Sequence, residues 1–147
     1  DKKLILCPHE QQDSAALQQV EQFWQAVGAE TRQISAEEHD QIFAAVSHMP
    51  HVLAFSFVHQ IEDHPDGAKY LDFAASGFRD FTRIASSHPA IWTDICMANR
   101  QSLLDLIEGQ YQQLARVQAM LEAGDSDGLY RYFEEAKQTR DDWLDKQ

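Results

Sequence analysis

The sequence predicts a mainly α fold, in which a helical bundle follows a short β-α-β unit. From residue 35 onward, apolar residues recur every three or four positions, the spacing that gives a helix one apolar face. Before residue 35, two short strand-like runs flank one helical segment of the same kind. Two strands are marginal as an independent sheet, so we expect this unit to need further strands from elsewhere.

Composition bounds the class of protein. The 147 residues suffice for one domain with a core, or for one domain plus a fragment of another. A formal net charge of −12 argues against a nucleic-acid partner, because phosphates need a positive surface. We find no apolar run close to the roughly 20 residues of a membrane span and no signal segment. We therefore expect a cytoplasmic protein without membrane contact. Cys7 and Cys96 are too few for a disulfide framework or a thiolate zinc site.

The first 34 residues predict strand, helix and strand in that order. Leu4–Pro8 is a short apolar run that a proline stops, as expected of a buried strand. Asp13 or Ser14 can cap a helix that Gly28 ends, and Ala29–Ile34 can form the second strand. Because the chain supplies no further strands, we interpret residues 1–34 as the end of a larger sheet.

From Ser35 the expected elements are helical. Ser35 and Glu38 fit a capping box, and Pro50 should kink or break the apolar-faced segment between residues 42 and 57. The remaining expectations, in chain order, are a loop at 63–67, a helix at 70–75, a helix opened by Ser87 before Pro89, a long helix from Asn99 to Leu121 ended by Gly124, and a last helix capped by Asp125 or Ser126.

Two segments carry more polar chemistry than a plain helix needs. The first is Ser47–His51, preceded by His39 and Asp40, and the second is Gly77–Ser87, followed by Trp92 and Asp94. A neutral imidazole at His51 could donate or accept a hydrogen bond. The planar guanidinium of Arg83 suits a carboxylate, with Asp80 placed to orient it. Trp92 could supply an apolar wall with one N–H donor.

Each of these residues also has an ordinary structural interpretation. Arg79, Asp80 and Arg83 have the spacing of helix-surface ion pairs, which is the favoured reading from spacing alone. Trp92 alone is more often a core residue. A metal-dependent hydrolase would need ligands beyond four candidates that show no convincing ligand spacing: His39, Asp40, His48 and His51. The favoured interpretation of His48 and His51 is a buried, hydrogen-bonded histidine. On physical grounds the chain is a helical domain with a possible anion pocket.

The order of these motifs resembles the prephenate dehydrogenase family, which includes cyclohexadienyl and arogenate dehydrogenases. The resemblance runs from about Leu4 to the last helix and rests on these segments: His39–Asp40, Ser47–His51, Gly77–Ala85, Trp92–Ile95 and Asn99. It implies an enzyme of tyrosine biosynthesis that oxidises prephenate with NAD or NADP, releases carbon dioxide and yields 4-hydroxyphenylpyruvate. It also implies a Rossmann-type nucleotide-binding domain followed by a helical domain that dimerises and closes the substrate cleft.

The resemblance assigns roles to individual residues. Arg83 matches the arginine that grips the carboxylate on the substrate ring, and His51 a cleft histidine associated with prephenate use. Trp92 matches a tryptophan near the side-chain end of the substrate. The supporting positions that it implies are Asp80, Ser47, His39 and Gly77, with Ser76 standing where many relatives have another glycine.

The same resemblance indicates that the chain is part of a longer enzyme. None of the six glycines lies in a Gly-x-Gly-x-x-Gly pattern, and the family's catalytic histidine precedes the Leu4–Pro8 strand. We therefore interpret 1–34 as the C-terminal remnant of the nucleotide-binding domain and 35–147 as the helical substrate-cleft and dimerisation domain. We expect a homodimer, arogenate as a possible second substrate, tyrosine as a possible inhibitor, and no turnover by these residues alone. The alternative is a non-catalytic helical module for dimerisation or ligand sensing.

Overall fold

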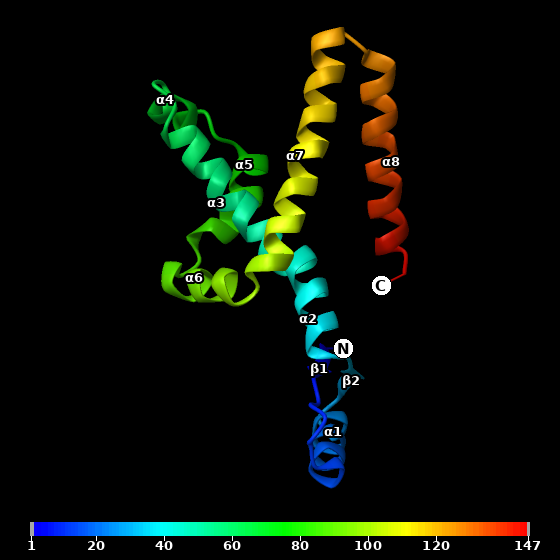
Figure 1. Cartoon of the computed structure of the whole chain (residues 1–147). Coiled ribbons are helices and arrows are strands. Elements are labelled where there is room, and N and C mark those ends of the chain that lie inside the picture. The colour runs from blue at the N-terminus through cyan, green and yellow to red at the C-terminus, as the bar shows by residue number, and fades with distance from the viewer. Residues whose placement is uncertain (1, 147) are drawn as a thin grey trace. The chain divides into compact units, whose positions relative to one another are not determined.

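The computed structural model describes residues 2–146 and confirms the mainly α fold (Figure 1). The chain divides into two compact units, Asp1–Leu106 and Ile107–Gln147, and the division falls inside helix α7. This division differs from the domain boundary expected after residue 34, which stays a prediction.

The first unit begins with the expected β-α-β arrangement. Strands β1 (Lys2–Leu6) and β2 (Ala29–Gln33) pair in parallel, with Lys2 opposite Ala29 and Leu6 opposite Gln33. Helix α1 (Ser14–Ala26) connects the two strands, and the Asp13 side chain accepts the N–H groups of its first turn. No residue of α1 is buried. The exposed apolar side chains of this helix are Val20, Phe23 and Trp24, so the unit lacks a covering layer among the described residues.

A long helical segment follows the sheet. It consists of α2 (Ala36–Phe43), the π-helical turn η1 (Ala44–His48) and α3 (Met49–Glu62). The Ser35 hydroxyl accepts the Glu38 N–H at 3.0 Å, as the capping box predicts. Of the kink or break predicted at Pro50, the break is wrong. Instead of breaking, the helix widens by one π turn just before the proline, with the Met49 N–H donating to the Ala44 carbonyl.

The continuous helix from Ala36 to Glu62 is also long and apolar enough to cross a membrane by length and composition. The expectation of no membrane contact stays a prediction, because an averaged hydropathy tolerates the scattered polar residues Ser47, His48 and His51, which interrupt every contiguous apolar run here. The core helix of a protein assembly meets the same criterion, so the helix alone does not establish a membrane span.

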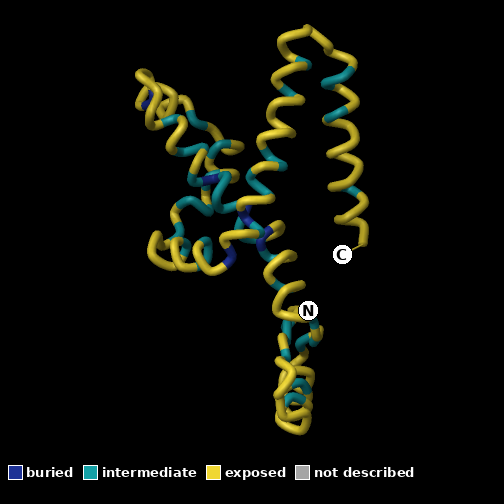
Figure 2. Tube along the Cα trace, viewed as in Figure 1, coloured by how far each residue is buried: buried dark blue, intermediate teal, exposed yellow. Residues whose placement is uncertain are grey.

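Four short elements complete the packing around α3. They are α4 (Gly67–Asp72), α5 (Ser76–Thr82), the 3-10 turn η2 (Arg83–Ser86) and α6 (Pro89–Ala98). The helix predicted at 70–75 therefore starts and ends earlier, and residues 73–75 form a non-helical link to α5. Phe57 of α3 contacts the rings of Phe78 and Phe81, which holds α5 against α3. Figure 2 shows how few residues are buried; the buried apolar residues are Ala44, Met49, Ala54 and Leu103.

The second unit is a helical hairpin formed by the part of α7 (Arg100–Ala123) after Leu106 and by α8 (Ser126–Leu144). Gly124 has a φ of +65° at the turn, a conformation that glycine adopts without strain. The Asp125 carboxylate then accepts the Gly128 N–H at the start of α8. Between the helices, the Tyr132 hydroxyl donates to Gln113, and the Arg116 guanidinium lies over the Tyr132 ring. Large apolar side chains of this unit stay exposed: Tyr111, Leu114, Leu121, Tyr130, Phe133, Trp143 and Leu144.

Candidate functional site

The candidate site centres on a stack between an imidazole and an indole. The His51 ring on α3 lies against the Trp92 ring on α6, with ring centroids 3.5 Å apart and planes 18° apart. The Nδ1 atom of His51 is 2.9 Å from the Ser47 carbonyl, one helical turn earlier. A carbonyl oxygen only accepts, so His51 carries a proton on Nδ1. In the neutral ring, Nε2 is then a free acceptor.

A second histidine lies beside the same indole. The His48 ring meets the Trp92 ring edge to face, with centroids 6.2 Å apart. The Nδ2 atom of Asn99 is 3.3 Å from His48 Nδ1 and 2.6 Å from the Asp40 carbonyl oxygen. Sequence reasoning weighed His48 as a metal ligand, favoured a buried and hydrogen-bonded histidine instead, and gave Asn99 no role in the site. The available signal was the position of His48, three residues before His51 and next to the proline that perturbs the helix.

The electrostatics of this cluster favour a neutral His48. Burial of the ring lowers the pKa of His48, and the neighbouring His39 and His51 lower it further. The Asp40 carboxylate raises the pKa and partly opposes these effects. His39 itself lies 3.0 Å from that carboxylate through Nδ1, and its ring packs against Phe43. His48 therefore acts as an uncharged hydrogen-bonding group near neutral pH.

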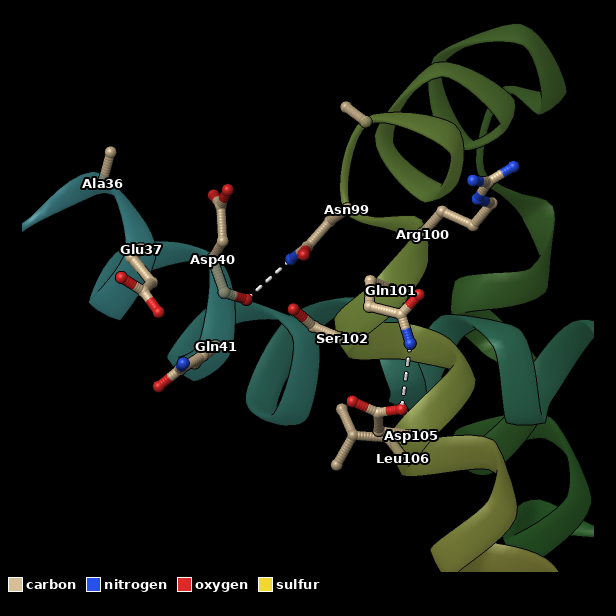
Figure 3. A pocket seen from close by; sticks show the side chains of 11 residues that line it. Ala36, Glu37, Asp40, Gln41, Asn99, Arg100, Gln101, Ser102, Asp105 and Leu106 are labelled. Atoms are coloured by element: carbon tan, nitrogen blue, oxygen red, sulfur yellow. Dashed lines mark hydrogen bonds between the residues drawn. The ribbon is translucent and has the colours of Figure 1, made fainter.

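Two cavities border the cluster in the first unit. The larger, about 770 Å³, lies between α2 and the start of α7, and Figure 3 shows Asn99 reaching the Asp40 backbone across it. Its lining carries three carboxylates (Glu37, Asp40 and Asp105) against the one guanidinium of Arg100, so it does not suit an anion. The smaller, about 380 Å³, lies between α3 and α6. Trp92 forms part of its mainly apolar wall.

The predicted arginine site is positioned by a different element. Arg83 begins η2, directly after α5, and its side chain is exposed. Among residues 2–146, neither Arg83 nor Asp80 forms an ion pair or a side-chain hydrogen bond. Both pairings considered from the sequence, Asp80 with Arg83 and the wider set with Arg79, are therefore absent from the described residues. The Arg83 guanidinium is left available to an external anion.

Gly77 lies in the first turn of α5. A Cβ atom added there would meet nothing within 4 Å. The described residues thus give no internal reason for a glycine at this position. A close approach at Gly77, as the resemblance implies, would have to come from a molecule or chain outside residues 2–146.

The structure thus brings together only some of the predicted site residues. Ser47, His51 and Trp92 are in direct contact or hydrogen-bonded. Arg83, Asp80 and Gly77 share the α5–η2 segment, which packs on α3, and His39 lies one element earlier on α2. No group of three or more His, Cys, Asp or Glu side chains within the described part of the chain is arranged to hold a metal ion.

Comparison with known proteins identifies relatives over most of the chain. Residues 35–135 match the family model described as the prephenate dehydrogenase dimerization domain. A prephenate dehydrogenase of Bacillus subtilis (strain 168) is 39% identical over 139 residues, covering 93% of this chain and 37% of the relative. A cyclohexadienyl dehydrogenase of Zymomonas mobilis is 29% identical and covers 95% of this chain and 48% of the relative. The chain thus spans between about a third and a half of these relatives.

Solved structures show the same correspondence. The prephenate dehydrogenase of Aquifex aeolicus, in complex with hydroxyphenyl propionate and NAD+, superposes with a TM-score of 0.87 at 33% identity, covering 95% of this chain and 49% of that one. A Synechocystis arogenate dehydrogenase gives a TM-score of 0.85 at 23% identity, covering 96% of this chain and 52% of that one. At that identity, the second match supports the fold alone.

Proposed function

Because the chain belongs to the prephenate dehydrogenase dimerization-domain family, we propose that it is the substrate-cleft and dimerisation part of an enzyme that oxidises prephenate. In this reaction the ring loses a hydride and a carboxyl group as carbon dioxide, and 4-hydroxyphenylpyruvate forms. Aromatisation makes the step strongly favourable, so the protein mainly has to orient the substrate and assist proton removal from the ring hydroxyl. Residues of this chain supply the orientation.

The observation that carries this proposal is the Ser47–His51–Trp92 arrangement. The indole provides an apolar wall, and the imidazole stacked on it provides a polar contact for the side-chain end of the substrate. The Ser47 carbonyl fixes the rotation of His51 through the 2.9 Å contact. A ring substrate with polar substituents needs both kinds of surface together.

Arg83 supplies the charge that this surface lacks. Prephenate carries two carboxylates, and an exposed guanidinium without an ion-pair partner among residues 2–146 suits one of them. We assign Arg83 to the ring carboxylate, His51 and Trp92 to the side-chain end, and Asp80 to the space beside the arginine. Supporting roles fall to Ser47, His39 and Gly77.

The nicotinamide cofactor accepts the hydride when it is bound. The described residues do not fit a dinucleotide: β1, α1 and β2 form a two-stranded parallel pair, and the loop between β1 and α1 contains no glycine. NAD or NADP would therefore be held by residues outside this chain. The catalytic histidine would also lie outside it. The exposed Phe23 and Trp24 of α1 are suited to packing against further elements of such a sheet domain.

A homodimer follows from the exposed face of the hairpin. Tyr130 and Phe133 on α8 and Leu121 on α7 are more than half exposed within a unit that has only two helices. Such a hairpin cannot cover its own apolar residues. A second copy of the chain would cover them, in keeping with the description of the matching family.

A turnover assay of the full-length polypeptide tests the proposal. Purified enzyme should reduce NAD or NADP with prephenate as substrate, and arogenate and each cofactor should be compared in parallel. Inhibition by tyrosine, which resembles the product, is expected to be competitive with prephenate. Residues 1–147 alone should show no turnover. Absence of activity with either substrate and either cofactor would favour a non-catalytic dimerisation or ligand-sensing module.

A further inference from the structure

Asn99 is the one buried polar side chain among the described residues, with 7% of its surface exposed. It lies at the junction of α6 and α7, where its backbone N–H donates to the Ile95 carbonyl and its own carbonyl accepts the Leu103 N–H. Its side chain crosses to α2 and η1 and contacts residues 59 and 51 positions away, namely Asp40 and His48. Figure 3 shows the first of these contacts.

Hydrogen-bonding chemistry determines the direction of both contacts. An amide nitrogen has two hydrogens and cannot accept. The Asp40 carbonyl takes one hydrogen at 2.6 Å, so the same nitrogen offers its second hydrogen to His48 Nδ1 at 3.3 Å. The opposite orientation of the amide would place its oxygen against the Asp40 carbonyl, two acceptors facing each other. His48 Nδ1 therefore carries a lone pair, and the proton of the neutral ring is on Nε2.

His51 has the opposite arrangement. Its Nδ1 donates to the Ser47 carbonyl, so the lone pair of its neutral ring is on Nε2. Both rings lie against Trp92, one stacked and one edge to face. The two neutral rings thus offer opposite hydrogen-bonding groups to a ligand: an N–H donor on His48 and an acceptor nitrogen on His51.

We propose that Asn99 is a positioning residue that fixes His48 as a neutral imidazole with its proton on Nε2, so that His48 joins His51 in the substrate site as its donor. The pair would recognise a ligand that offers an oxygen acceptor to His48 and a hydroxyl or ammonium hydrogen to His51. The assignment of this role to substrate recognition rests on the proposed function. The positions of the two protons are independent of that function, because they follow from the hydrogen bonds alone.

The charged and titratable groups that act on His48 come from two elements. They are His39 and Asp40 on α2 and His51 on α3. The Asp40 carboxylate favours a charged His48, whereas burial and the two histidines favour the neutral ring. The Asn99 hydrogen bond also favours the neutral ring, because it is made to the lone pair that only the neutral form possesses.

Nitrogen-15 NMR of the histidine rings in the full-length protein tests the proton positions directly. For His48 we expect a pyridine-type Nδ1 and a pyrrole-type Nε2 near neutral pH, and for His51 the reverse. A His48→Gln variant assigns the signals. A protonated Nδ1 on His48 in the unaltered protein would overturn the proposal, whether or not the protein has dehydrogenase activity.

Asn99→Asp provides the perturbation, because it replaces the donor with an acceptor of nearly the same size. We expect the His48 proton to move to Nδ1 and the midpoint of His48 titration to rise by about one pH unit or more. In the plot of kcat/KM for prephenate against pH, the acidic limb should shift to higher pH by a similar amount.

Gln101→Glu is the matched control for charge, since it adds the same charge at an exposed position two residues away. It should leave the His48 ring signals unchanged. An equal shift in both variants would mean that charge alone acts on His48, and would contradict the positioning role. If Asn99→Asp does not fold, the spectrum of the unaltered protein still decides.

Discussion

Truncation of Arg83 to alanine separates substrate binding from stability. The Arg83 side chain is exposed and makes no ion pair or side-chain hydrogen bond within residues 2–146. Its removal should therefore change the free energy of unfolding by less than about 0.5 kcal/mol. A hydrogen bond to a charged group contributes about 1.5–3 kcal/mol when a ligand forms it. At about 1.4 kcal/mol per tenfold change, the KM for prephenate should rise roughly 10- to 150-fold.

Steady-state kinetics of the full-length enzyme, run beside thermal unfolding, measures both quantities. Arg79→Ala is the matched control, because it removes the same charge one turn earlier, also at an exposed position. We expect less than about a threefold change in its KM. An unchanged KM in Arg83→Ala would remove Arg83 from the site. Equal changes in both variants would show that general charge, and not a specific carboxylate contact, attracts the substrate.

Three further predictions use other parts of the chain. His51→Asn should lower kcat/KM for prephenate more than for arogenate; equal losses would count against a selectivity role. Gly67→Ala should destabilise the protein by about 1–3 kcal/mol, because its Cβ would lie 2.2 Å from the Ile61 carbonyl oxygen. Gly77→Ala, whose added Cβ would meet no atom within 4 Å, should be neutral or stabilising when both glycine variants are unfolded in denaturant. Comparable losses of unfolding free energy in the two variants would refute this reasoning. Phe133→Glu should shift sedimentation at micromolar concentration toward monomer, and an unchanged dimer would place the interface elsewhere.

The ends of the helices were predictable because local chemistry sets them. Asp13, Ser35 and Asp125 each accept backbone N–H groups at a helix start, and Gly124 takes the positive φ that ends α7. The start of α4 was not predictable in this way. A Cβ atom at Gly67 would lie 2.2 Å from the Ile61 carbonyl oxygen, so the turn after α3 needs a glycine there, a close approach that residue spacing does not reveal.

The pairing of Asp80 with Arg83 shows how a spacing rule fails. Ion pairs three or four residues apart can form on a helix because the two side chains lie on the same face. The α-helix ends at Thr82 and Arg83 begins a 3-10 turn, but Arg83 keeps an α-helical backbone with φ −50° and ψ −39°, and residues three apart in a 3-10 turn also share a face. The residue identities were correctly noticed in the sequence. Spacing allows the two side chains to pair, but an ion pair between exposed groups contributes too little free energy to fix their rotamers.

The His48–Asn99 contact was beyond sequence reasoning for another reason. Its partners are 51 residues apart, and no periodic pattern links the junction of α6 and α7 to the π turn. By contrast, the contact of His51 with the Ser47 carbonyl spans four residues within one helical segment. The sequence therefore indicated the polar segment, but not the residue that holds its second histidine.

The two parts of the proposed site should contribute differently to recognition. The histidine pair is organised before any ligand binds, because Ser47 and Asn99 already fix both rings. A ligand that leaves such preorganised, partly buried groups unpaired forfeits their hydrogen bonds, so this part should discriminate strongly between related substrates. Arg83 is exposed and forms no ion pair within the described part of the chain, so its charge should strengthen the binding of any carboxylate placed near it. The ratio of kcat/KM for prephenate to kcat/KM for an analogue lacking only the side-chain oxygens should then be larger in the unaltered enzyme than in Asn99→Asp. The Arg83→Ala variant should instead lower kcat/KM for both substrates by a similar factor.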